Sequence, residues 1–418
     1  MKTSAVRLYG KQDLRLETFD LPEIGDGEIL AKVVCDSLCM STYKTALQGE
    51  THKRVPKDVR NHPAIIGHEF CGVLLQIGAK WRDQFKSGDK FAIQPTLSPL
   101  NTFRTAGYSF ETIGGDATYI VIPEEFMICG SLLPYHGEAF FAGALSEPLS
   151  CVAGTFKAMY HTEKGRYAHR MGITPGGRMA ILAGAGPMGL AAVDYILHTD
   201  RRPGSLVVTD IDAKRLERAS RILPVEEAAR MGVALTYMNT GNMDNPAAEL
   251  LALTGGAGYD DVLVFAPVTA VVEQADAILG YDGCLNFFAG PANKDFFAKM
   301  NFYDVHYSSA HVVGTSGGNT EDMSECLKMV GEGSLTPAAL ITHVGGLDAV
   351  IDTTLNLPSI PGGKKIIYTH AKMPLTAIED FEQLGRNDPF FQRLYELTQE
   401  TNGMWNKQAE DYLLSVKG

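Results

Sequence analysis

MAILAGAGPMGLAAVDYIL, residues 179–197, is the stretch that decides the fold. A short apolar run opens it, glycines follow at positions 184, 186 and 189, and an apolar segment of helical character closes it. This order predicts a buried strand, a glycine turn and a helix, with the G-x-G-x-x-G spacing of a dinucleotide-binding site. An ordinary buried strand–turn–helix is the alternative interpretation, because the pattern alone has low specificity.

Each glycine of the turn has a physical task in the first interpretation. Gly184 permits the tight turn out of the strand, Gly186 lets a pyrophosphate approach the backbone, and Gly189 lets the helix pack close to the strand. The phosphates would lie over the free N–H groups at the positive end of the helix dipole. We therefore expect the turn to bind the cofactor through Gly184, Gly186, Pro187, Met188 and Gly189.

An acidic residue ends the next apolar strand pattern, Ser205–Asp210. Asp210 lies about 20 residues beyond the last glycine, where a carboxylate accepts hydrogen bonds from the adenine ribose. Such a carboxylate would repel a 2′-phosphate, so NAD is favoured over NADP. Lys214 and Arg215 follow and would help to bind NADP. Asp210 as a simple helix N-cap is a second interpretation, compatible with the first.

The rest of the chain divides by pattern. Strand patterns alternate with helical segments and predict a doubly wound parallel sheet of the Rossmann type, at 179–183, 205–210, 233–238, 261–265, 283–288 and 311–315. The first ~150 residues contain short strands with glycine corners, as in a β-rich barrel. Residues 374–418 are charged and helical in character. The chain is therefore expected to be an α/β protein with a β-rich part.

Composition excludes several classes of protein. The 418 residues are 45% hydrophobic and 21% charged with a net charge of −12, which argues against nucleic acid as the main partner. The N-terminus lacks the apolar segment of a signal peptide, and the apolar span at 179–193 is too short for a membrane helix. The seven irregularly spaced cysteines suggest a reducing compartment. We expect a cytoplasmic protein with no membrane partner.

A second constellation lies far upstream of the glycine turn. Cys39, His68, Glu69 and Glu147 offer one thiolate, one imidazole and a carboxylate, the donors of a catalytic zinc site with an open fourth position. On a regular strand His68 and Glu69 would point to opposite faces, so both reach one metal only if Gly67 kinks the chain. Glu147 is therefore a competing carboxylate ligand. The alternative is a buried thiol, a turn histidine and a helix-terminal charge.

Several motifs together resemble the zinc-containing medium-chain dehydrogenase/reductase family, on its polyol (sorbitol-type) branch. The resemblance covers roughly residues 1–370. It rests on C-x-S at Cys39–Ser41, G-H-E-x-x-G-x-x-x-x-x-G at Gly67–Gly78, G-D-x-F at Gly88–Phe91, G-G-x-A-x-Y at Gly114–Tyr119, E-P-L-S at Glu147–Ser150, and GAGPMG followed by Asp210.

The resemblance implies an architecture and a site. It implies a GroES-like β-rich catalytic domain with an inserted Rossmann NAD(P)-binding domain, with boundaries expected at 1–157, 158–317 and 318–418, the last part carrying a helical extension. It implies one catalytic zinc on Cys39, His68 and Glu69, with Glu147 near the open position and Ser41 relaying the substrate proton. Relatives are usually dimers or tetramers, so we expect a homo-oligomer.

Three departures from the family pattern matter. Residues 95–118 contain no cysteine, so we expect the structural zinc of many members to be absent. Thr42 replaces the aspartate that often supports the zinc-bound histidine, so support for His68 is expected from elsewhere. Lys44 stands where a histidine is often found.

Within the branch, the chain most resembles a member that interconverts a ketose phosphate and a hexitol phosphate. Basic residues crowd the segment after the zinc cysteine and could hold a phosphate, namely Lys44, Lys53, Arg54, Lys57 and Arg60, with Arg104 further on. Lys44 is the preferred phosphate ligand; a solvated basic loop is the alternative. We expect reversible NAD(P)H-dependent reduction of a sugar-phosphate ketone. An unphosphorylated polyol as substrate, a metal-free reductase and a non-enzymatic nucleotide-binding module remain alternatives.

Overall fold

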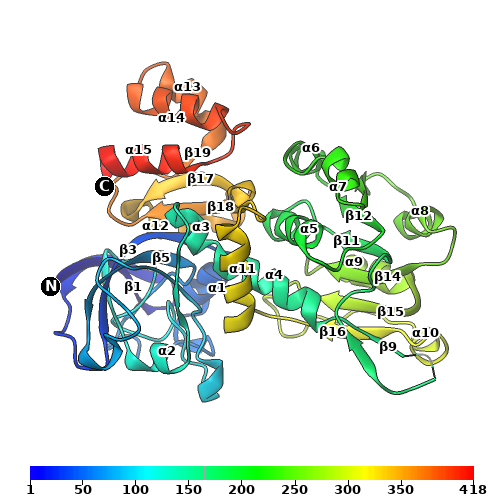
Figure 1. The fold of residues 1–418 in the computed structure, drawn as a ribbon, viewed down its shortest axis with the longest axis horizontal. Helices are drawn as coiled ribbons and strands as arrows, with labels where there is room; N and C mark the ends of the chain where they lie inside the picture. The colour runs from blue at the N-terminus through cyan, green and yellow to red at the C-terminus, as the bar shows by residue number, and fades with distance from the viewer. Residues whose placement is uncertain (164) are drawn as a thin grey trace. The chain divides into compact units, whose positions relative to one another are not determined.

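The computed structural model describes residues 1–163 and 165–418. Its chain forms two compact units (Figure 1). The first unit comprises Met1–Glu147 and Asn319–Gly418, and the second comprises Pro148–Gly318. The boundary expected after residue 157 lies inside helix α4 (Ser146–Ala158), and the one expected after residue 317 is adjacent to Gly318.

A six-stranded parallel sheet forms the centre of the second unit. Its strands lie in the order β13-β12-β11-β14-β15-β16, with bounds β11 Arg178–Leu182, β12 Ser205–Asp210, β13 Ala234–Asn239, β14 Tyr259–Val264, β15 Leu279–Phe287 and β16 His311–Gly314. Numbered along the chain this is the order 3-2-1-4-5-6 of a Rossmann fold. The doubly wound sheet expected from the sequence is therefore confirmed.

Helices connect these strands, and a hairpin precedes them. The helices are α5 Pro187–His198, α6 Ala213–Ile222, α7 Val225–Arg230, α8 Pro246–Leu253, α9 Thr269–Ala277 and α10 Phe302–Tyr307, and the hairpin pairs β9 Tyr160–Thr162 with β10 His169–Met171. Apolar side chains from the sheet and from α8 and α9 pack into one core. Because a parallel sheet is covered on both faces, its strands are almost continuously apolar.

The first unit contains a larger, mostly antiparallel sheet in the order β19-β17-β18-β3-β5-β6-β8, with β7 also pairing β3. The strands are β3 Ile29–Leu38, β5 Phe70–Ile77, β6 Lys90–Ile93, β7 Tyr119–Ile122, β8 Leu132–Pro134, β17 Ile341–Gly346, β18 Lys364–Tyr368 and β19 Thr376–Ala377. A smaller sheet pairs β1 Lys2–Gly10 with β2 Asp13–Asp20 and β4 Ala64–Ile65. The returning strands after residue 340 thus complete the sheet that the N-terminal half begins, which confirms the insertion.

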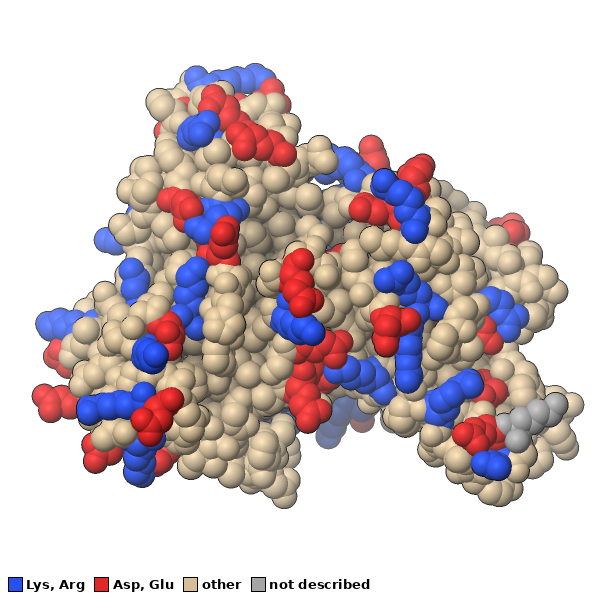
Figure 2. Space-filling model, in the orientation of Figure 1, with Lys and Arg blue, Asp and Glu red and all other residues tan. Residues whose placement is uncertain are grey.

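Helices of the first unit complete its core. They are α1 Met40–Gln48, α2 Glu124–Ile128, α3 Phe140–Ala144, α11 Thr320–Gly331, α12 Val350–Asn356, α13 Phe381–Gly385, α14 Pro389–Gln399 and α15 Lys407–Lys417. The last three form the extension expected after residue 370, drawn in orange to red in Figure 1, in which α14 contacts both α13 and α15. Acidic and basic side chains are interspersed on the face drawn in Figure 2. Among the described residues no helix is long and apolar enough to cross a membrane.

Candidate metal and cofactor sites

Cys39 stands at the junction between β3 and α1. It is the N-cap of α1 in an extended conformation, with φ −133° and ψ 167°, and its Sγ accepts a hydrogen bond from the backbone N–H of Ser41 at 3.3 Å. Burial, and then the charge of Glu69, raise the pKa of the thiol, whereas Lys364 lowers it. A cation bound beside this half-buried thiol would favour the thiolate form.

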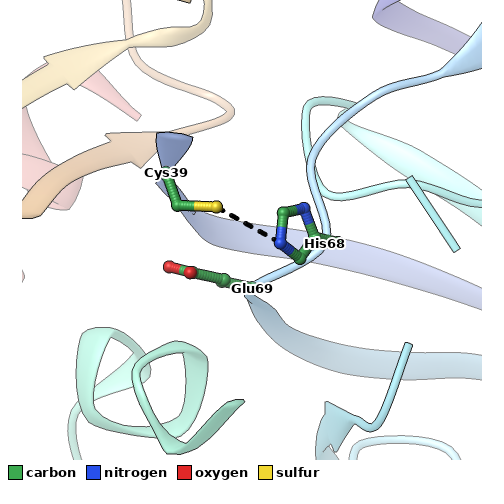
Figure 3. Close-up of side chains that lie close together, drawn as sticks. All are labelled: Cys39, His68 and Glu69. Carbon is green, nitrogen blue, oxygen red and sulfur yellow. Dashed lines mark hydrogen bonds between the residues drawn. The ribbon is translucent and has the colours of Figure 1, made fainter. Parts of the chain in front are cut away.

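His68 and Glu69 follow a kink in the chain between β4 and β5. Gly67 has φ +86°, and a Cβ there would lie 2.6 Å from the backbone nitrogen of Asp116. The position therefore demands glycine for both its backbone conformation and its packing. The kink expected at Gly67 is confirmed, and it turns both side chains toward Cys39 (Figure 3).

The three side chains converge closely. Ligand atoms of Cys39, His68 and Glu69 lie within 4.8 Å of one another, and the Sγ of Cys39 is 3.3 Å from Nε2 of His68. Nδ1 of His68 lies 3.4 Å from the hydroxyl of Thr42. The expectation that Thr42 leaves His68 to be supported elsewhere is therefore wrong. Burial lowers the pKa of His68, which favours the neutral imidazole that binds metals.

Lys364, at the start of β18, was missed in the sequence. Its Nζ lies 2.5 and 2.6 Å from the two carboxylate oxygens of Glu69, and both side chains are buried. Burial opposes the charge of the lysine, but Glu69 and Cys39 outweigh burial and raise its pKa. The partners are 295 positions apart. The available signal was a pair of lysines, Lys364 and Lys365, at the start of a short apolar strand pattern, because buried lysines need partners.

Glu147, in the first turn of α4, lies near this group but outside it. Among the described residues, the set of ligand atoms within 4.8 Å comprises Cys39, His68 and Glu69. Burial, and then the charge of Glu69, raise the pKa of Glu147 to about 7, whereas His68 lowers it. Glu147 is therefore close enough to all three members of the group, Cys39, His68 and Glu69, for its charge to interact with theirs.

Ser41 and Lys44 lie on α1, three positions apart and so on one side of the helix. Ser41 is exposed, and its carbonyl accepts a hydrogen bond from the Thr45 hydroxyl at 2.9 Å. Lys44 is partly buried, and burial lowers its pKa while the charge of Cys39 raises it. Both residues thus lie within the first two turns of α1, whose N-cap is the candidate metal ligand Cys39.

The remaining basic residues have different surroundings. The guanidinium of Arg54 lies 5.3 Å from the ring centroid of Tyr108, and the ammonium of Lys53 lies 5.9 Å from that of Phe103. Two others bond elsewhere: Lys57 donates to the carbonyl of Glu50 at 2.6 Å, and Arg104 pairs with Glu125 at 3.0 Å, while Arg60 is exposed. The structure therefore brings part of the expected basic group toward the site.

Tyr108 and His52 are two further residues that the sequence did not reveal. The hydroxyl of Tyr108 lies 3.4 Å from Nε2 of His68, and its ring stacks on His52 with centroids 5.6 Å apart. Burial lowers the pKa of His52 to about 4, helped by the charges of Arg54, Lys53 and Lys44. The positive charges of Arg54, Lys53 and Lys44 therefore act on His52, which stacks on Tyr108.

The glycine turn of the second unit has the expected shape with one difference. A Cβ on Gly186 would meet nothing within 4 Å, whereas one on Gly189 would lie 2.0 Å from the carbonyl oxygen of Gly184. Gly186 thus faces open space, and Gly189 lets α5 pack closely. The left-handed residue is Ala183, with φ +54°. Gly184 is required instead by packing, because its Cβ would lie 2.5 Å from Cγ2 of Ile181. Pro187 and Met188 open α5 directly after this turn.

Asp210 holds the turn from the neighbouring strand. Its Oδ2 accepts a hydrogen bond from Ala185 N–H at 3.2 Å, and its Oδ1 accepts one from Asp212 N–H at 3.0 Å. The N-cap of α6 is Asp212, which accepts from the N–H groups of Lys214 and Arg215. The interpretation of Asp210 as a helix N-cap is therefore wrong. Arg215 contacts Asp212 at 3.6 Å.

Two family models match the chain. The alcohol dehydrogenase GroES-like domain matches residues 25–131, and the zinc-binding dehydrogenase model matches residues 187–332. Three full-length relatives are the uncharacterized protein YggP of Escherichia coli, the mannitol-1-phosphate 5-dehydrogenase of Aliivibrio fischeri and the L-sorbose 1-phosphate reductase of Klebsiella pneumoniae. They are 53%, 49% and 47% identical, over 99–100% of this chain and 97–98% of theirs.

The chain belongs to the zinc-dependent medium-chain dehydrogenase/reductase family. It is thus an oxidoreductase of the alcohol and polyol dehydrogenase type.

Solved structures agree on the fold of this dehydrogenase. A 2R,3R-butanediol dehydrogenase from Bacillus subtilis matches with a TM-score of 0.70 and 20% identity, covering 88% of this chain and 99% of its own. A putative zinc-binding dehydrogenase from Sinorhizobium meliloti, solved with NADP, matches with the same TM-score and identity over 88% and 100%. At this identity the likeness establishes the GroES-like and Rossmann architecture.

Proposed function

We propose that this dehydrogenase reduces a sugar-phosphate ketone reversibly with NAD(P)H and one zinc ion, L-sorbose 1-phosphate to D-glucitol 6-phosphate. The observation that carries the proposal is the convergence of Cys39, His68 and Glu69 within 4.8 Å. Two full-length relatives named for phosphorylated sugars support the substrate class.

The donor set fits zinc. A thiolate, a neutral imidazole and a carboxylate would hold the ion and leave a fourth position for substrate, with Glu147 as the neighbouring or competing carboxylate. When bound, zinc would polarise the ketone and the nicotinamide would supply the hydride. Lys364 balances the negative charge of Glu69.

Ser41 is the proposed proton relay to the substrate oxygen. Ser41 lies in the first turn of α1, two positions after the proposed ligand Cys39, and the residue is exposed. The hydroxyls of Tyr108 and Thr42 lie beside the two ring nitrogens of His68. A hydroxyl can donate and accept at once, so a serine there can pass a proton between substrate and solvent.

Lys44 is the proposed phosphate ligand. It follows Ser41 on the same side of α1, and with Lys53 and Arg54 it places positive charge around His52. A phosphate monoester carries nearly two negative charges at neutral pH, so several cations close together are needed to bind it.

The glycine turn is the proposed cofactor site. Open space at Gly186 leaves room for the pyrophosphate, and Gly184, Pro187, Met188 and Gly189 shape the start of α5 around it. Two hydrogen bonds use part of the accepting capacity of Asp210 and leave lone pairs for ribose hydroxyls. NAD is therefore the preferred cofactor, with Arg215 as a ligand should NADP bind.

A screen of substrates tests the proposal. Oxidation of NADH and NADPH is followed spectrophotometrically over ketose phosphates and free ketoses, with zinc measured in the same sample. We expect turnover with a ketose phosphate. The variant Lys44→Met should raise KM for phosphorylated substrates, whereas Lys57→Met, whose ammonium bonds the carbonyl of Glu50, should not.

An unphosphorylated polyol is the second candidate substrate. The sorbitol dehydrogenase of Bacillus subtilis, 28% identical over 60% of this chain, favours it. Equal kcat/KM on free and phosphorylated sugars would support this candidate and contradict the role of Lys44. Activity that survives complete removal of zinc would contradict the metal-dependent reaction.

A further inference from the structure

The C-terminal extension places a buried carboxylate beside two segments that lead to the metal site. Glu410, on α15, is completely buried. Its two oxygens accept hydrogen bonds from the backbone N–H groups of Phe140 at 2.8 Å and Phe141 at 2.9 Å. The hydroxyl of Tyr368 donates to Glu410 at 3.0 Å. One side chain of the extension thus bonds to the start of α3 and to the end of β18.

Both segments continue to residues of the proposed site. Helix α3 runs into α4, where the Ser146 hydroxyl bonds back to the carbonyl of Ala142 at 2.9 Å and Glu147 follows directly. Strand β18 begins at Lys364, the buried partner of Glu69, and ends at Tyr368. Glu410 is therefore connected to Glu147 through α3 and the start of α4, and to Glu69 through β18 and Lys364.

A buried aromatic group fixes Glu410 in turn. The indole N–H of Trp405, which is fully buried, donates to the hydroxyl of Tyr368 at 2.7 Å. Phe381 packs against the Trp405 ring with centroids 6.4 Å apart. Because Tyr368 accepts from Trp405 and donates to Glu410, its hydroxyl has one orientation, and the three side chains form a single network.

The full-length relatives share this part of the chain. The three relatives align over 99–100% of it, whereas the solved neighbours cover 88% of it while using almost all of their own lengths. The unmatched share is similar in length to the extension. The matches to the three full-length relatives therefore include the extension.

We infer that Glu410 is a positioning residue that holds Glu147 and the Lys364–Glu69 pair in place for the reaction. The inference rests on the proposed function for its catalytic consequence. Two backbone N–H groups and one hydroxyl point at the carboxylate, and an amide would turn its NH₂ group against one of these donors. Removing the carboxylate should loosen α3 and β18 at the ends that face the ligands.

The test compares Glu410→Gln with Asp411→Asn, an exposed neighbour on the same helix that pairs with Lys407. Hydrogen–deuterium exchange is measured on the metal-free full-length chain, in peptides covering 140–150 and 364–368. We expect at least tenfold faster exchange there in the Gln variant, zinc release to a chelator at least tenfold faster, and kcat for the ketose at least tenfold lower. Affinity for NADH should change less than twofold, and the Asn variant should match the parent chain.

A lower melting temperature with unchanged local exchange, zinc release and kcat would overturn the inference, because it would leave Glu410 a merely structural residue. Should Glu410→Gln fail to fold, Tyr368→Phe removes the hydroxyl contact alone and should shift the same readouts in the same direction; no shift would overturn the inference. The exchange measurement needs neither metal nor substrate, so failure of this inference is distinguishable from failure of the proposed function.

Discussion

A single lysine, Lys364, pairs with a carboxylate of the candidate metal site. Lys364 and Glu69 are both nearly inaccessible to solvent and bond at 2.5 and 2.6 Å. Such a pair contributes little net stability compared with apolar residues, but removing one partner leaves an uncompensated buried charge. The ion pair is therefore best understood as setting the position and charge of Glu69.

Replacing Lys364 by alanine should destabilise the fold. We expect the free energy of unfolding to fall by about 3–5 kcal/mol, the range for a broken buried pair. Urea unfolding of the metal-free chain measures it. Lys407→Ala, which breaks an exposed pair with Asp411, should change it by less than about 1 kcal/mol. Equal effects of the two substitutions would show that the buried pair is solvated.

Asp116 should make stability depend on pH. Burial raises its pKa from 3.8 to about 7, so between these values the native chain holds a proton that the unfolded chain has lost. Unfolding free energy therefore falls as pH rises through this window, by about 1.4 kcal/mol per pH unit for one proton. Asp116→Asn should remove this contribution. Denaturant titrations of the metal-free parent chain and of the metal-free Asp116→Asn chain measure the free energy of unfolding across this pH range. The same pH dependence in both chains would contradict the prediction.

At the scale of elements, the kink between β4 and β5 assembles the ligands. Gly67→Ala should destabilise the chain and abolish zinc binding, because the new Cβ would lie 2.6 Å from a backbone nitrogen. Gly88→Ala is the matched control, since its φ is +93° but nothing lies within 4 Å of the Cβ. Zinc content and thermal unfolding measure both. We expect the control to keep its zinc and to lose only about 1 kcal/mol of stability; zinc retained at Gly67→Ala would be the contrary result.

The turn between β11 and α5 gives two further substitutions with opposite outcomes. Gly186→Ala should fold normally and bind NADH at least tenfold more weakly, because its Cβ points into open space where the pyrophosphate would lie. Gly189→Ala should destabilise the second unit, since its Cβ would lie 2.0 Å from a carbonyl oxygen. NADH fluorescence titration and thermal unfolding separate the two effects. Unchanged NADH affinity in Gly186→Ala would place the cofactor elsewhere.

At the scale of the whole molecule, the fold was largely predictable from local patterns. Apolar runs and glycine spacing marked the six strands of the parallel sheet, because a covered sheet needs continuous apolar strands. The convergence of Cys39, His68 and Glu69 was predictable as a set from the family resemblance together with the kink that Gly67 allows, whereas donor types and spacing alone left a non-metal interpretation open.

What the sequence left open depends on contacts between distant positions. Lys364 is 295 positions from Glu69, and Glu410 is 270 from Phe140. Tyr108, 40 positions from His68, lies in a loop without regular periodicity. Local sequence gives at most a hint that Lys364 is buried and does not identify the partner of any of the three; tertiary packing brings each side chain to its partner.

The zinc content of the purified chain tests the central claim most directly. Metal analysis is performed on the parent chain, on Cys39→Ser and on Cys129→Ser, a control thiol of similar exposure outside the ligand group. The proposal predicts one zinc per chain in the parent and the control and none in Cys39→Ser. Zinc retained in Cys39→Ser, or absent from the parent chain, would contradict the proposed site.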